Sequence, residues 1–244
     1  METFWYFFEV FGYPLAIMAL IFAVVASLYT KFVFSKFSKV PTASGVTGAQ
    51  VAEQILRQFN LHGGVGYEHE VRVEQVSGTL TDHYSPKEKT LRLSDAVYAS
   101  ASVAAAGVAA HECGHAIQDE QGYIPNRIRS ALHIPASVGS RGGPWLAIGG
   151  LILSGYAPSI GLLLLKIGII FFLFATLFYF VTLPVEFNAS SRAIRILDDA
   201  NILTNQELRG AKRVLNAAAM TYVAAAASSL ITLLRLIAMS RRRR

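Results

Sequence analysis

The hydrophobic positions of the chain gather into four long runs, and two of these are suited to crossing a membrane. Residues 11–29 contain no charged side chain, and residues 159–183 are interrupted only by Lys166. A helix that spans a bilayer needs about 20 predominantly apolar residues. We therefore predict a transmembrane helix in each of these two runs.

The run at residues 145–157 is shorter and spans a bilayer only if its helix begins upstream, near Ile134. A tight turn at Pro158 then leads directly into the longer run that follows. Two apolar helices joined by so short a turn must lie antiparallel to each other. We therefore predict a transmembrane helical hairpin over residues 131–184.

The last run, residues 215–239, contains Arg235. A guanidinium facing lipid is costly, so we expect this segment to be a packed or re-entrant helix that does not cross. The predicted organisation is an N-terminal transmembrane helix, a soluble domain, the hairpin and a C-terminal part with a basic tail. These parts correspond to residues 1–30, 31–130, 131–184 and 185–244.

The region that we expect to be soluble alternates between helical and strand patterns. A capping box formed by Thr47 and Gln50 starts a helix with one apolar stripe. The stripe consists of Val51, Ile55, Leu56 and Phe59. Ser102 can cap a second, alanine-rich helix over residues 103–119. Both helices are expected to pack closely against neighbouring elements.

Three short strands are predicted between these helices. Residues 71–76 alternate between apolar and polar side chains. Residues 79–84 and 90–94 form a hairpin that turns at Ser85 and Pro86. The fold class is therefore α+β: a multi-pass helical membrane protein that carries a small domain of helices and a short antiparallel sheet.

Composition supports a membrane protein. Hydrophobic residues make up 53% of the chain and charged residues 16%, against about 25% charged in a typical soluble domain. The net charge of +6 could indicate a nucleic-acid partner, but the basic residues flank the apolar runs, so we expect a lipid bilayer and no nucleic acid. The single cysteine, Cys113, excludes an intrachain disulfide and is expected to be a small packing residue.

The placement of basic residues predicts an orientation. They follow the first run, precede the second and follow the third, so they share one side if all three runs cross. The positive-inside rule assigns that side to the cytoplasm. The residues concerned are Lys31, Lys36, Lys39, Arg127, Arg129, Arg192 and Arg195.

The most informative motif is GVAAHECGHAIQ, residues 107–118, within the second predicted helix. Side chains four residues apart share a helix face, so His111 and His115 can bind one metal ion together. Glu112 can then act as the general base toward an attacking water. This HExxH pattern is typical of zinc peptidases and predicts a zinc-dependent hydrolase with one Zn²⁺ per chain. A pair of hydrogen-bonded histidines in a packed helix is the alternative.

A catalytic zinc site needs a third protein ligand. We favour Glu186, because Pro184 starts a new helix at the end of the third run and two apolar runs bring the chain back to the side of His111. A carboxylate that only stabilises a helix start is the alternative for this glutamate. The other histidines remain open as ligands, with His83 and His133 next in order. The histidines outside the motif are His62, His69, His83 and His133.

The segments TDHYSPKEKTLRLS, GVAAHECGHAIQ and LPVEFNASSRA resemble the neutral zinc metallopeptidases of the YugP type, which are akin to HtpX-like gluzincins. The resemblance covers nearly the whole chain and implies a zincin-like domain with His111, His115 and Glu186 on zinc and Glu112 as the base. It implies a multi-pass protein of a bacterial-type inner membrane, with polypeptide substrates that are membrane or unfolded proteins.

The resemblance also suggests residues around the metal. HtpX-like enzymes carry an aspartate four residues after the ligand glutamate, where this chain has Ser190, so Asn188 is the candidate for a hydrogen bond to a ligand histidine. The strand that ends at Asp82, His83 and Tyr84 is the expected substrate-binding edge, with ordinary hairpin packing as the alternative.

A donor to the developing oxyanion is also expected, and Tyr222 or Arg235 could provide it if the last apolar run folds back over the site. The sequence thus predicts a membrane-embedded zinc endopeptidase that faces the cytoplasm. A membrane scaffold that binds zinc without catalysis is the alternative function. A metal transporter is disfavoured, because Lys166 and Arg235 are too few to line a path.

Overall fold

The computed structural model describes residues 2–62 and 70–241, so His69 and the last three arginines lie outside the described residues. The chain divides into two compact units. Unit 1 comprises Met1–Ala26, Arg127–Pro184 and Thr221–Arg244, and unit 2 comprises Ser27–Asn126 and Val185–Met220. The HExxH motif and Glu186 both belong to unit 2, which is therefore the unit that matters for the site.

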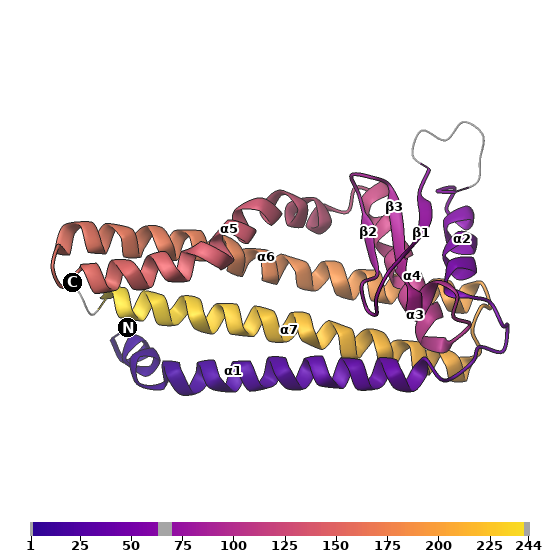
Figure 1. Ribbon diagram of the computed structural model, residues 1–244, viewed down its shortest axis with the longest axis horizontal. Coiled ribbons are helices and arrows are strands. Elements are labelled where there is room, and N and C mark those ends of the chain that lie inside the picture. The colour runs from indigo at the N-terminus through magenta and orange to yellow at the C-terminus, as the bar shows by residue number, and fades with distance from the viewer. Residues whose placement is uncertain (1, 63–69, 242–244) are drawn as a thin grey trace. The chain divides into compact units, whose positions relative to one another are not determined.

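Helices account for most of the described chain (Figure 1). In chain order the elements are α1 (Glu2–Phe37), α2 (Gly48–Gln58), β1 (Arg72–Val76), β2 (His83–Ser85), β3 (Thr90–Ser94), α3 (Asp95–Tyr98), α4 (Val103–Glu120), α5 (Ile124–Leu153), α6 (Pro158–Asp199) and α7 (Asn205–Arg241). The strands lie in unit 2 together with α2, α3 and α4. The predicted α+β class is confirmed.

The sheet has the strand order β1–β3–β2 and is mixed. Strands β2 and β3 are antiparallel, as the predicted hairpin requires, but β1 runs parallel to β3, so an entirely antiparallel sheet was a wrong expectation. The cause is the strand order, because β3, the most buried of the three strands, lies at the centre and pairs with β2 on one side and β1 on the other. The chain reverses between β1 and β2 and again in the hairpin, so β1 and β3 run in the same direction and their pairing is parallel. Strand β2 is left as an edge.

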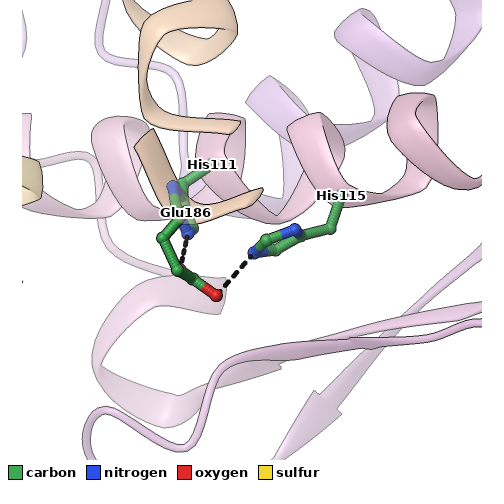
Figure 2. A group of neighbouring side chains, drawn as sticks. All are labelled: His111, His115 and Glu186. Carbon is green, nitrogen blue, oxygen red and sulfur yellow. Dashed lines mark hydrogen bonds and ion pairs between the residues drawn. The ribbon is translucent and has the colours of Figure 1, made fainter. Parts of the chain in front are cut away.

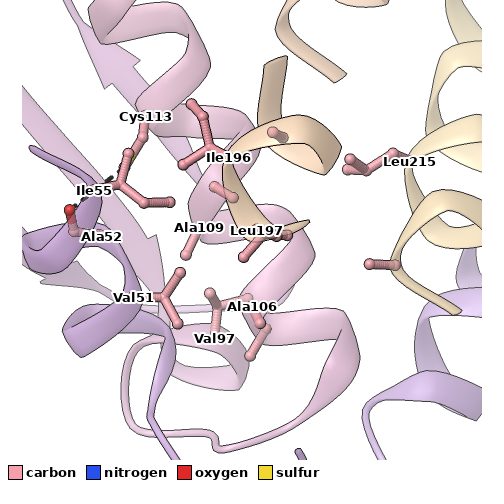
Figure 3. Packing of buried hydrophobic residues seen from close by; sticks show 14 of the residues in the cluster. Val51, Ala52, Ile55, Val97, Ala106, Ala109, Cys113, Ile196, Leu197 and Leu215 are labelled. Carbon is pink, nitrogen blue, oxygen red and sulfur yellow. Dashed lines mark hydrogen bonds between the residues drawn. The ribbon is translucent and has the colours of Figure 1, made fainter. Parts of the chain in front are cut away.

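The two predicted helix starts are present in unit 2. Thr47 and Gln50 form the reciprocal capping box of α2, and the Ser102 hydroxyl accepts a hydrogen bond from the backbone of Ala105 at the start of α4. The apolar stripe of α2 packs against α4 in the core of unit 2 (Figure 3). Cys113 lies in this core and its thiol is 3.6 Å from the carbonyl oxygen of Ala52. Burial, with a smaller contribution from the charge of Glu112, raises the pKa of this thiol, which fits a packing role.

In unit 1, the short turn predicted at Pro158 joins α5 to α6, and both helices contribute to one buried cluster. The fully buried Ala147 and Ala175 allow close contact between side chains of the cluster. The remaining members are Leu165, Phe172, Leu233 and Leu236.

Within the described residues, three helices are long and apolar enough to cross a membrane: α1 over Val10–Phe37, α6 and α7. Helix α5 is not among them, although we expected it to form half of the transmembrane hairpin. Its three arginines and two internal prolines dilute its apolar surface. Helix α7 was expected not to cross because of Arg235, but that guanidinium lies 3.7 Å from the centre of the Tyr13 ring. An aromatic face compensates part of the cost of burying such a charge.

Candidate metal centre

The two histidines of the motif lie one turn apart on α4. The Ser102 cap and the alanine-rich sequence make α4 regular, so residues four apart share a face. The ring centres of His111 and His115 are 4.8 Å apart and the ring planes are nearly perpendicular, at 84°. Only 14% and 12% of their side-chain surfaces are exposed. The rings are thus held near each other and largely shielded from water.

Glu186 on α6 approaches both rings, although it is 75 residues beyond His111. Its Oε2 lies 3.2 Å from Nε2 of His111, and its Oε1 lies 3.7 Å from Nε2 of His115. Figure 2 shows the carboxylate between the two imidazoles. Glu186 is only 2% exposed. The structure therefore brings together the three residues that the sequence suggested as ligands.

The close approach of α4 and α6 depends on a small residue between the two histidines. A Cβ at Gly114 would lie 2.9 Å from the carbonyl oxygen of Ala189, which is backbone and cannot move aside alone. Ala189 is three residues beyond Glu186 on α6. Gly114 therefore allows the backbone contact that holds Glu186 against the histidine face.

The geometry of this cluster fits a zinc ion. Each of the three residues offers a ligand atom, and these atoms lie within 4.8 Å of one another. Ligand bonds of about 2.0–2.1 Å in a tetrahedral site imply ligand separations of about 3.3 Å. The two observed distances between nitrogen and oxygen, 3.2 and 3.7 Å, bracket that value. Two imidazoles and one carboxylate, with a fourth position open, is a donor set of catalytic zinc.

Each histidine has a hydrogen-bonding partner at its second nitrogen. The Ser190 hydroxyl lies 3.1 Å from Nδ1 of His111. The side-chain oxygen of Gln118 lies 3.0 Å from Nδ1 of His115. The expectation for Asn188 needs correction, because it contacts Gln118 rather than a histidine, at 3.0 Å. Ser190, at the position where HtpX-like enzymes carry aspartate, makes the direct contact instead.

Gln118 was missed by the sequence analysis. Its signal was its position three residues after His115, on the same face of α4. Glutamine is also common on solvated helix surfaces, so the spacing alone did not distinguish it. In the structure Gln118 is fully buried, which a solvated glutamine would not be.

Two of the three residues suggested for the substrate-binding edge make packing contacts, one within the hairpin and one with α4. The Asp82 carboxylate accepts hydrogen bonds from the Ser94 backbone at 2.7 Å and its hydroxyl at 3.0 Å. Burial raises the pKa of Asp82, and these hydrogen bonds oppose the rise. Tyr84 donates to the Asp119 carboxylate at 2.9 Å. His83 is exposed, and its Nδ1 lies near the backbone oxygen of Thr81. Both packing and an accessible strand edge are therefore present at β2.

Tyr84 is tied to the end of the metal-motif helix through Asp119. The Lys89 ammonium also lies 2.9 Å from this carboxylate. Burial, followed by the negative charge of Asp119, raises the pKa of the Tyr84 phenol far above its usual range. The phenol is thus kept neutral and donates a hydrogen bond that holds β2 against α4.

Among the described residues, the group that could hold a metal consists of His111, His115 and Glu186, and the other candidates have other neighbours or belong to unit 1. His62 bonds the Val71 carbonyl oxygen through Nδ1 at 2.9 Å. His133 belongs to unit 1, with its ring centre 6.1 Å from that of Phe178. Tyr222 and Arg235 also belong to unit 1. Glu112 follows His111 directly on α4 and is 8% exposed.

A cavity of about 340 Å³ in unit 2 adjoins Asn188, the residue that contacts Gln118. Asn188 and Arg192 line it, and the Arg192 guanidinium donates to the Asn188 side-chain oxygen at 2.7 Å. The metal-cluster residues do not line this cavity. The other lining residues are Gln58, Phe59, Ile117, Ser191, Arg195, Ile196 and Asp199.

Comparison with known proteins identifies a family of zinc metallopeptidases. The chain matches the family described as "Putative neutral zinc metallopeptidase" over residues 13–241. It is 43% identical over 223 residues to the "Putative membrane protease YugP" of Bacillus subtilis (strain 168), which covers 91% of this chain and 93% of the relative. No solved structure matches the chain. With the match extending over nearly its whole length, the chain belongs to this family of neutral zinc metallopeptidases.

Proposed function

We propose that this protein is a membrane-embedded, zinc-dependent endopeptidase in which His111, His115 and Glu186 hold one zinc ion and Glu112 is the general base. The observation that carries the proposal is the convergence of the three donors, with 3.2 and 3.7 Å between the carboxylate oxygens and the ring nitrogens. Three protein ligands leave a position open for water or substrate. A structural zinc site would use four protein ligands.

Zinc, when bound, supplies Lewis acidity that makes water acidic near neutral pH and polarises a peptide carbonyl. The chain supplies the proton transfers. The Glu112 carboxylate accepts a proton from the attacking water and returns it to the departing amine nitrogen, so one side chain acts first as base and then as acid. Its position next to His111 on a capped, regular helix supports this role.

An extended polypeptide is the substrate class that suits the fold. Strand β2 is an edge of the sheet and leaves backbone groups on its outer side available for pairing. A substrate strand added there would present its carbonyls in register, largely independent of side-chain identity. The exposed His83 on β2 is the residue best suited to contact such a strand.

The proposed location is a membrane of bacterial type, with the site facing the cytoplasm. Three helices of the described part of the chain are long and apolar enough to cross, and the relative from Bacillus subtilis is described as a membrane protease. The basic residues that flank the apolar runs support the cytoplasmic orientation. Membrane or unfolded proteins are then the accessible substrates.

The test compares the wild-type protein with Glu112→Gln, both purified in detergent. We expect equal zinc content, because Glu112 is not proposed as a ligand, and loss of cleavage of an unfolded test protein by the variant. Cleavage by the variant at the wild-type rate would contradict the role of Glu112. Stoichiometric zinc with no cleavage by the wild type would instead support a zinc-binding membrane scaffold.

A further inference from the structure

Gln118 is a fully buried glutamine whose side chain makes three hydrogen bonds. Its oxygen faces Nδ1 of His115 at 3.0 Å. Its nitrogen donates to the backbone oxygen of Val185 at 2.9 Å and to the side-chain oxygen of Asn188 at 3.0 Å. A single side chain therefore connects a histidine on α4 with the turn of α6 that carries Glu186.

The direction of these hydrogen bonds is fixed by groups that cannot reverse. A backbone carbonyl only accepts, so the atom of Gln118 that faces Val185 must be the nitrogen. A guanidinium only donates, so the atom of Asn188 that lies 2.7 Å from Nε of Arg192 must be the oxygen. That same oxygen also faces the nitrogen of Gln118. Both constraints orient the Gln118 amide in the same way.

The orientation of the amide determines the tautomer of His115. With its nitrogen turned toward Val185 and Asn188, Gln118 presents its oxygen to the imidazole, and an amide oxygen only accepts. In the neutral ring the proton must therefore be on Nδ1. The lone pair is then on Nε2, the nitrogen that lies 3.7 Å from Oε1 of Glu186. This is the tautomer that a cation in the cluster requires.

His111 is held differently. Its Nδ1 faces the Ser190 hydroxyl at 3.1 Å, and a hydroxyl can either donate or accept. Ser190 alone therefore does not select a tautomer for His111. The contrast makes Ser190 a useful control, because it contacts one histidine of the cluster without belonging to the chain of hydrogen bonds behind the other.

We infer that Gln118 is a positioning residue that fixes His115 in its Nδ1–H tautomer and fixes α4 to α6 beside Glu186. The inference rests on the proposed metal site, because the Nδ1–H tautomer matters by leaving the lone pair of Nε2 available to the ion. Arg192 and Asn188 form the outer part of the same chain of hydrogen bonds. Arg192 is itself held by the residue that caps the C-terminus of α4, since its Nη1 donates to the Gln121 side-chain oxygen at 2.6 Å.

Two substitutions separate the two tasks of Gln118. Gln118→Met introduces an apolar side chain of similar volume and removes both the acceptor for His115 and the donor to Val185. Gln118→Glu retains an acceptor for His115 but places a carboxylate against the oxygens of Val185 and Asn188. Gln118→Met should therefore allow His115 to adopt either tautomer. Gln118→Glu should keep the Nδ1–H tautomer and disturb the contact between α4 and α6.

The direct measurement is a long-range ¹H–¹⁵N correlation spectrum of the full chain without metal, labelled at histidine nitrogens. It is recorded at a pH at which the ¹⁵N shifts themselves show the ring to be neutral. The His115 signals are assigned by their loss in His115→Asn. We expect a protonated Nδ1 in the wild type, Gln118→Glu and Ser190→Ala, and a mixture of tautomers in Gln118→Met.

Zinc affinity provides the second readout. Changes to hydrogen-bonding partners of metal ligands lower metal affinity by about 10- to 100-fold, and we expect a loss of that size in Gln118→Met. A protonated Nε2 in the metal-free wild type would overturn the inference without needing any variant to fold. An unchanged tautomer and unchanged affinity in folded Gln118→Met would overturn it as well. Failure of the wild type to bind zinc would instead contradict the proposed function.

Discussion

Gly114 on α4 and Ala189 on α6 meet backbone to backbone: a Cβ at Gly114 would lie 2.9 Å from the Ala189 carbonyl oxygen. This contact explains why a glycine lies between two residues of the metal motif. The histidines project from one helix and Glu186 from the other, so the distance between the two backbones sets the distance between nitrogen and oxygen donors.

Substituting Gly114→Ala should therefore weaken both the fold and metal binding. The added methyl must push α4 from α6, and overpacking of this kind costs about 1–3 kcal/mol. Thermal unfolding followed by circular dichroism and zinc titration would measure the two effects. Gly149→Ala is the matched control, because a Cβ there meets no atom within 4 Å. It should be neutral or should stabilise the protein by about 0.5–1 kcal/mol. Equal behaviour of the two variants would contradict the role given to Gly114.

The hydrogen bond from Tyr84 to Asp119 predicts a dependence on alkaline pH. The pKa of the folded-state phenol is raised by burial and by Asp119, so the unfolded chain loses this proton first, near pH 10. The stabilisation is therefore complete below about pH 10 and is lost as the pH rises further.

Comparison with Tyr84→Phe isolates this phenol from the other tyrosines. The advantage of the wild type in free energy of unfolding should decline above about pH 10, by up to about 1.4 kcal/mol per pH unit. Thermal midpoints of both proteins measured across that range provide the test. A constant difference between the two proteins would show that the Tyr84 phenol is not perturbed in the folded state.

The contact between Arg235 and Tyr13 in unit 1 should be measurable as a coupling energy. The guanidinium carbon lies 3.7 Å from the ring centre, and such pairs contribute from about 0.5 to about 2 kcal/mol depending on desolvation. We expect Arg235→Met and Tyr13→Leu to be non-additive in thermal stability, with the double variant less destabilised than the sum of the single ones. Additive effects would mean that the two side chains do not stabilise each other.

Much of the site could be predicted from the sequence, because most of its residues are close together in the chain. His111, Glu112 and His115 are identified by spacing on one helix, and the capped starts of α2 and α4 are set by Thr47 and Ser102. Glu186 is distant in sequence and was suggested by the helix start expected at Pro184 together with the family resemblance. That helix start was a wrong expectation, because α6 runs without a break through Pro184. These features depend on short-range geometry or on a known pattern.

The features that the sequence did not predict depend on tertiary contacts. The parallel pairing of β1 with β3 follows from the central position of β3 in the sheet, which period-two alternation does not encode. Gln118 acquires its role only because Val185 and Asn188 come from another helix. Arg235 looked incompatible with lipid because its aromatic partner, Tyr13, lies more than two hundred residues earlier.

The most direct test of the metal site is the zinc content and zinc affinity of the purified full chain with and without Glu186. We expect one zinc per wild-type chain. The loss of affinity in Glu186→Ala should exceed the roughly 10- to 100-fold effect of changing a residue that only hydrogen-bonds to a metal ligand. Glu120→Ala, at an exposed carboxylate on the same helix as the histidines, should bind zinc like the wild type. Zinc bound to Glu186→Ala as tightly as to the wild type would contradict the account.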